Sequence, residues 1–144
     1  MSRRRGPATW SKALVLALLL AGCADPPPGE QLGPLGEELL PPGSEIVKSR
    51  EGACPQLEGN PSCVRIYFTS GLSEEERADA LEASARSAGW KVVSREQRVD
   101  GTLVELGREG YRGFVAIWED EHAAPCREEP DTSCADELQV IEDV

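Results

Sequence analysis

The stretch that decides the fold is Cys63-Val64-Arg65-Ile66-Tyr67-Phe68-Thr69. β-Branched and aromatic residues dominate this stretch, and Val64, Ile66 and Phe68 fall on one face of an extended chain. Such alternation predicts a strand with one buried face. The six aromatic residues that follow Trp10 all lie between positions 67 and 118, so we expect the hydrophobic core in that part of the chain.

A helix is expected directly after this strand. Ser73 can cap its N-terminus, and Glu76 completes a capping box. Gly89 supplies the C-terminal stop. Small apolar residues recur at helical spacing and predict a narrow buried stripe that lets the helix lie close to a sheet; they are Ala78, Leu81, Ala85 and Ala88.

Three further strands are expected after the helix. Residues 90–95, 102–106 and 111–118 are rich in strand-forming residues, and Asp100-Gly101 is a strong hairpin turn. The order is β-α-β-β-β, which predicts the α+β class: a small two-layer sandwich with one helix on a four-stranded, disulfide-stapled sheet. A right-handed crossover would make the first two strands parallel and place the helix on one face.

Two segments flank this unit. Residues 45–48 could add an edge strand. The acidic segment 128–144 contains Leu138, Val140 and Ile141, so it could form another edge strand or remain a mobile tail.

Length and charge limit the possible functions. The chain has 144 residues, with 15 Lys and Arg against 26 Asp and Glu, and a net charge of −11. A chain of this length fits one domain. Nucleic-acid binding requires a basic footprint, so nucleic acid is not expected as a partner.

The N-terminus has the layout of an export signal. Basic residues at positions 3, 4, 5 and 12 precede an apolar run over 13–21, which is about half the ~20 residues needed to span a bilayer. The run ends at Leu20-Ala21-Gly22-Cys23, which resembles the lipobox of bacterial lipoproteins. An ordinary secreted protein with a chance cysteine is the alternative.

This resemblance implies that residues 1–22 are a cleaved signal peptide and that Cys23 carries lipid. The protein would then sit on the extracytoplasmic side of a membrane. That is the outer face of the plasma membrane, or the outer membrane in a diderm host. Membrane lipid would be a partner through the covalent anchor. The mature chain would keep 11 basic and 26 acidic residues, a net charge of −15. We expect such a domain to be repelled by anionic headgroups.

A linker is expected between the anchor and the domain. Residues 24–43 contain six Pro and four Gly, which disfavour both helix and sheet. We therefore divide the mature chain into a flexible linker over 23–43 and a folded acidic domain over 44–144. The linker could be a tether or an unspecific spacer. Its four leucines fit a spacer poorly and could dock on the domain; they are Leu32, Leu35, Leu39 and Leu40.

Four cysteines remain after Cys23. In an exported chain an even number implies disulfides. The expected topology puts Cys63 and Cys126 at opposite ends of the sheet, so local pairs Cys54–Cys63 and Cys126–Cys134 follow. Metal or redox roles are the alternative, but zinc ligands pair across two to four residues and the chain has no C-x-x-C motif.

No motif in the chain names a reaction, so we expect neither catalytic residues, nor a metal site, nor a cofactor. His122 follows Glu119, Asp120 and Glu121, a run that could contribute to a cation site but that fits a solvated charge run better. The favoured function is a non-catalytic envelope accessory that binds another protein. Alternatives are a small-ligand or cation binder and a carboxylate-based hydrolase. Tyr111 or Trp118 exposed on a bare sheet face would favour protein binding.

Overall fold

A computed structural model describes residues 32–54 and 61–143. This part of the chain is an α+β domain, as expected. Its elements, in chain order, are α2 (Leu32–Leu39), β1 (Glu45–Ala53), β2 (Ser62–Thr69), α3 (Glu74–Ser87), β3 (Lys91–Arg98), β4 (Gly101–Arg108), β5 (Tyr111–Trp118), α4 (Asp120–Ala123), a 3-10 turn (Ala124–Arg127) and β6 (Asp136–Glu142).

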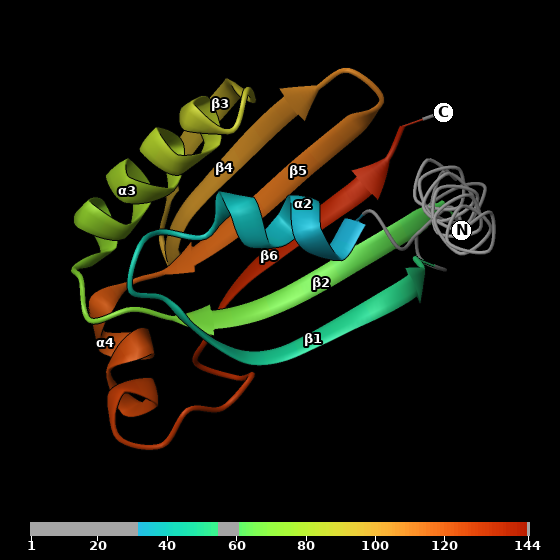
Figure 1. The fold of residues 1–144 in the computed structure, drawn as a ribbon. Helices are drawn as coiled ribbons and strands as arrows, with labels where there is room; N and C mark the ends of the chain where they lie inside the picture. The colour runs from blue at the N-terminus through green and yellow to red at the C-terminus, as the bar shows by residue number, and fades with distance from the viewer. Residues whose placement is uncertain (1–31, 55–60, 144) are drawn as a thin grey trace, which may run out of the picture.

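The strands form one six-stranded sheet in the order β1-β2-β6-β5-β4-β3. Every neighbouring pair is antiparallel. The strands that flank α3, β2 and β3, run in the same direction, but β6, β5 and β4 lie between them. The observed sheet therefore has two more strands than the four expected from the sequence. Both α2 and α3 lie on the same face of the sheet (Figure 1).

The helix α3 forms as its sequence predicts. The Glu76 N–H donates to Ser73 Oγ at 3.3 Å, which caps the helix, and Ser73 Oγ in turn donates to Glu76 Oε1 at 3.1 Å. Gly89 follows the helix with φ of +87°, a conformation that favours glycine. The buried side of the helix packs Ala78, Leu81 and Ala85 against the sheet.

The helix α2 contradicts the prediction that residues 24–43 contain no helix. Leu32 and Leu39 are 1% and 0% exposed and belong to the main core, with Leu35 and Leu40 packed against it. The alternative that these leucines dock is therefore confirmed. Pro34 lies in the first turn, where no intrahelical N–H is needed. Burying a leucine contributes about 1.5–3 kcal/mol, which outweighs a cost of about 1 kcal/mol for each helical glycine.

The C-terminal segment is neither an edge strand nor a tail. β6 lies between β2 and β5 and pairs with both along most of its length. Leu138 and Val140 are fully buried in the main core. At the N-terminal side of the domain, the edge strand expected over residues 45–48 forms as β1 and extends to Ala53. The outer strands are therefore β1 and β3.

The sheet has two different faces. The face under α2 and α3 carries the main core, including Val64, Ile66 and Phe68 of β2. We call the opposite side the open face. Each disulfide packs at one end of the open face: Cys54–Cys63 lies against Ile141 and Phe114, and Cys126–Cys134 lies with Val47 and Tyr67.

Candidate functional site

The two disulfides form the pairs expected from the sequence, Cys54–Cys63 and Cys126–Cys134, each with Cα atoms 5.6 Å apart. They close loops of similar length, so each contributes roughly 2–3 kcal/mol in the chain-entropy account. The second loop begins in the 3-10 turn that follows α4 and ends two residues before β6, so it helps to fix where β6 begins. Cys23, the expected lipid attachment site, lies outside the described residues.

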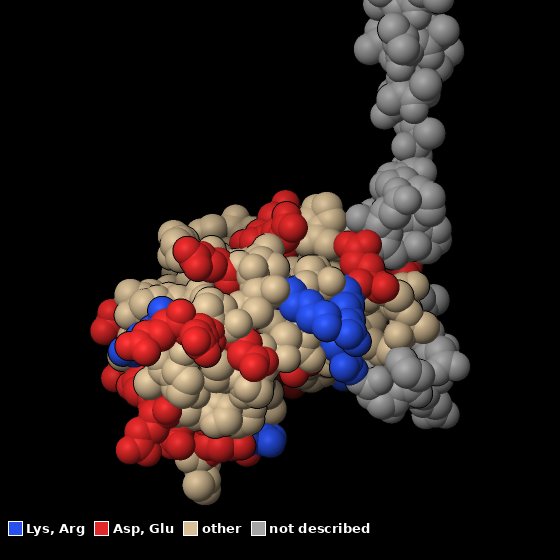
Figure 2. Space-filling view, turned by 90° about the horizontal axis from the view of Figure 1, so that it is seen from below, with Lys and Arg blue, Asp and Glu red and all other residues tan. Residues whose placement is uncertain are grey.

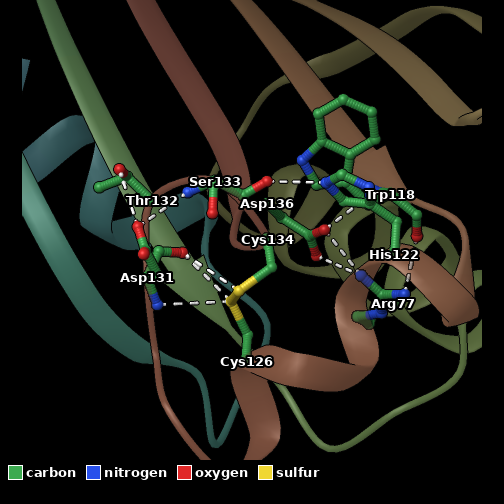
Figure 3. The surroundings of a disulfide bond; sticks show 9 residues. All are labelled: Arg77, Trp118, His122, Cys126, Asp131, Thr132, Ser133, Cys134 and Asp136. Atoms are coloured by element: carbon green, nitrogen blue, oxygen red, sulfur yellow. Dashed lines mark hydrogen bonds and ion pairs between the residues drawn. A yellow bond between two sulfur atoms is a disulfide. The ribbon is translucent and has the colours of Figure 1, made fainter.

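A buried ion pair lies beside the second disulfide (Figure 3). Arg77 Nη1 donates to both carboxylate oxygens of Asp136 at 2.7 Å, and the two side chains are 2% and 1% exposed. Arg77 Nη2 donates to the Trp118 carbonyl at 2.8 Å, and Nε donates to the Leu72 carbonyl at 3.1 Å. The Trp118 N–H donates to Asp136 Oδ1 at 3.0 Å. The pair thereby joins α3, β5 and β6.

A cavity of about 320 Å³ adjoins this ion pair and is lined in part by Phe68, Arg127 and the second disulfide. Burial raises the pKa of Asp136, while attraction by Arg77 opposes that shift. Both carboxylate oxygens of Asp136 accept hydrogen bonds from Arg77, and Oδ1 also accepts one from the Trp118 N–H, so the carboxylate is held in a network of protein donors. The geometry therefore suits a structural clamp better than the general acid–base pair of a hydrolase.

His122 lies outside the clamp. Its ring centroid is 4.1 Å from that of Trp118, and its Nε2 donates to the Ser133 carbonyl at 2.7 Å. Figure 3 shows the two rings side by side at the start of α4. Within the described residues, no group of three or more His, Cys, Asp and Glu side chains could hold a metal ion.

The two aromatic residues proposed for a bare face lie on different sides of the sheet. Tyr111 packs against the main core with Trp90, ring centroids 6.5 Å apart, so it lies on the helix-covered side and adds nothing to the open face. Val115 and Ile117 of β5 are buried on the core side. Trp118, the next residue, points to the other side and lies half-buried on the open face, beside His122.

The open face combines apolar and basic side chains. Leu103 and Ala116 are half-buried cross-strand neighbours on β4 and β5. Toward β1, cationic side chains gather on this face and on its edge; we call this group the basic stripe, and its members are Lys48, Arg50, Arg65 and Arg112. Figure 2 shows the largest basic patch of that view, on the side of the molecule where β1 lies, with acidic side chains spread around it.

The stripe has its own geometry. Arg50 and Arg65 are directly opposite each other across β1 and β2. The Arg112 guanidinium lies 5.3 Å from the centroid of the Phe114 ring, an arrangement that favours cation–π attraction. Among the described residues, Glu137 is the only carboxylate within ion-pair distance of the stripe, 3.9 Å from Arg65 Nε.

Sequence reasoning missed both the clamp and the stripe. Arg77 occupies the same line as Leu81 and Ala85, four and eight residues on, so its helical position was a usable signal of burial. Asp136 offered no such signal, because its partner is 59 residues away. The stripe depends on the pairing of β1, β2, β6 and β5, which one sequence does not reveal.

The class that fold and site define is a disulfide-linked α+β domain with one open sheet face. No family model, curated protein or solved structure matches the chain. No helix of the described residues is long and apolar enough to cross a membrane.

Proposed function

We propose that the chain is a membrane-anchored extracytoplasmic lipoprotein whose domain is a non-catalytic module that binds another protein of the envelope. The anchor follows from the resemblance of Leu20-Ala21-Gly22-Cys23 to a lipobox. Two disulfides support an oxidising compartment, because such bonds are rare in the cytosol.

The observation that carries the binding role is the open face. α2 and α3 cover one side of the sheet, while the other side has Leu103, Ala116 and Trp118 half-buried on β4 and β5. Partly exposed apolar side chains on a rigid sheet provide contact area at little entropic cost. The clamp of Arg77 and Asp136 holds β5 and β6 in place beneath this surface.

The anchor is tested by metabolic labelling with an alkyne-bearing fatty acid in a bacterial host. We expect the wild-type chain to take up the label and to begin at Cys23. Cys23→Ala removes the sulfur that would carry the lipid, so it should remain unlabelled, while the neighbouring change Ala24→Ser should leave labelling intact. Label on Cys23→Ala, or none on the wild-type chain, would contradict the lipoprotein assignment.

The binding face is tested by photocrosslinking in living cells. A benzoylphenylalanine at Leu103, on the open face, should give one adduct of constant mass. The same group at Ala83, exposed on α3, is the matched control and should give none. Equal adducts at both positions would mean that the open face is not the binding surface.

A further inference from the structure

We propose that the basic stripe rests on the anionic phospholipid headgroups of the membrane that holds the anchor. This inference rests on the proposed lipid attachment at Cys23. It assigns a membrane contact to the β1 side of the open face and leaves Leu103 and Ala116, nearer the other edge, for a protein partner.

Basic residues are unevenly distributed over the domain. Four of the 11 basic residues that follow Cys23 lie in the stripe, on an otherwise acidic chain. Arg50 and Arg65 are direct cross-strand neighbours, and like charges in that position repel each other. An anionic surface would relieve this repulsion, because two phosphate groups can neutralise both guanidinium charges. Glu137 is within ion-pair distance of Arg65 alone.

The chain enters the described domain at α2. Leu32 begins α2 and is buried. Gly33 lies so close to the Glu51 carboxylate that a Cβ at position 33 would collide with it. Glu51 follows Arg50 on β1 but points to the opposite face of the sheet, so the chain enters on the helix-covered side of the same edge strand that carries Lys48 and Arg50.

The chain between the proposed anchor and the domain is short. Because α2 packs on the sheet, only residues 24–31 separate Cys23 from Leu32. The nine residue steps from Cys23 to Leu32 reach about 28 Å in a polyproline conformation. A domain of this size is itself roughly 30 Å across. The β1 edge of the sheet, beside which α2 begins, is therefore held within reach of the lipid surface.

Net charge alone predicts the opposite arrangement, because a charge of −15 is repelled by anionic lipid. That repulsion is averaged over the whole molecule and is screened within about 8 Å at physiological salt. Charges in contact with headgroups are screened less. Each basic residue at an anionic surface favours contact by about fivefold. The local stripe can therefore orient the domain against its overall charge.

The two lysines of the mature chain make this testable, because Lys48 belongs to the stripe and Lys91 begins β3 at the opposite edge. Both are exposed. A sheet twists by about 20–25° per strand pair, so the two edges differ by roughly 100° or more and cannot both face one flat surface. Lys91 is thus an internal control for the reactivity of Lys48.

The experiment uses the full lipidated chain, reconstituted in vesicles of phosphatidylcholine alone or with about 30% phosphatidylglycerol. An amine-acetylating reagent is applied, and mass spectrometry measures each lysine. We expect Lys48 to react at least about fivefold more slowly in the anionic vesicles, and Lys91 to change little. About 0.5 M salt should restore the reactivity of Lys48.

Paired charge reversals provide the second measurement. Arg50→Glu with Arg65→Glu should abolish the protection of Lys48. Arg86→Glu with Arg98→Glu makes the same change in charge at exposed sites on α3 and β3, and should preserve it. All four substitutions are at exposed or half-buried side chains, so we expect the domain to fold in both variants.

Each outcome decides the inference. Equal reactivity of Lys48 in both vesicles, with the chain bound to them, would overturn the membrane contact and leave the lipoprotein assignment standing. Protection in neutral vesicles that rises with protein density would mean that a second copy covers the stripe, which would also overturn it. A chain that does not float with vesicles and carries no lipid would refute the proposed anchor instead.

Discussion

Replacing Asp136 with alanine is expected to lower the free energy of unfolding by about 3–5 kcal/mol, because it leaves the Arg77 charge buried without a counterion. The Arg77 side chain is only 2% exposed, so water cannot solvate the guanidinium in place of the lost carboxylate. The Trp118 N–H loses its acceptor as well. Urea unfolding followed by tryptophan fluorescence, under non-reducing conditions, measures the loss.

Asp79→Ala is the matched control for this change. Asp79 pairs with Arg95 at the same distance of 2.7 Å, but its side chain is 62% exposed. Exposed ion pairs contribute at most about 1 kcal/mol, so this variant should be nearly as stable as the wild-type chain. Equal costs for Asp136→Ala and Asp79→Ala would show that burial does not govern the strength of the clamp.

A double replacement separates the charge from the packing. Arg77→Met combined with Asp136→Leu removes both buried charges and keeps apolar volume at the site. Such exchanges are often neutral or stabilising in other proteins. Here we expect much of the loss to be recovered, with a remainder from the unpaired groups of Trp118 and Leu72.

Leu39→Ala is expected to cost about 2–5 kcal/mol, the range for removing a fully buried leucine from a packed core. Leu39 is the last residue of α2, is 0% exposed and belongs to the main core. The half-buried Leu35 of the same helix gives a graded control, since Leu35→Ala should cost clearly less. Thermal unfolding monitored by circular dichroism compares the two variants.

This pair of variants distinguishes a docked helix from a linker. If residues 32–39 were only a tether, both substitutions would fall within about 0.5 kcal/mol of the wild-type chain. A large cost at Leu39 therefore also supports the short reach between Cys23 and the domain on which the proposed membrane contact depends.

Sequence reasoning worked where the signal was local. Alternation located β2, and the capping box at Ser73 located the start of α3, because both patterns involve residues within a few positions. The cysteine pairs followed from short spacing together with the expected direction of the strands. β5 formed over the predicted residues, 111–118.

The errors share one physical cause. Gly33, Pro34 and Gly36 disfavour a helix locally, yet α2 forms because Leu32 and Leu39 gain more by burial than the backbone loses. Gly36 also allows α2 to lie close to β2, since a Cβ there would come within 2.8 Å of Ile66. Tertiary packing overrode local propensity.

The sequence by itself determined the α+β class, the position of α3, the disulfide pairs and the acidic character of the domain. Only the tertiary structure decided that β6 lies in the middle of the sheet, that Arg77 meets Asp136, and that basic side chains collect on one face of an acidic molecule. These features join residues far apart in the chain. Their free energy depends on burial and on neighbours across the sheet, which no local pattern encodes.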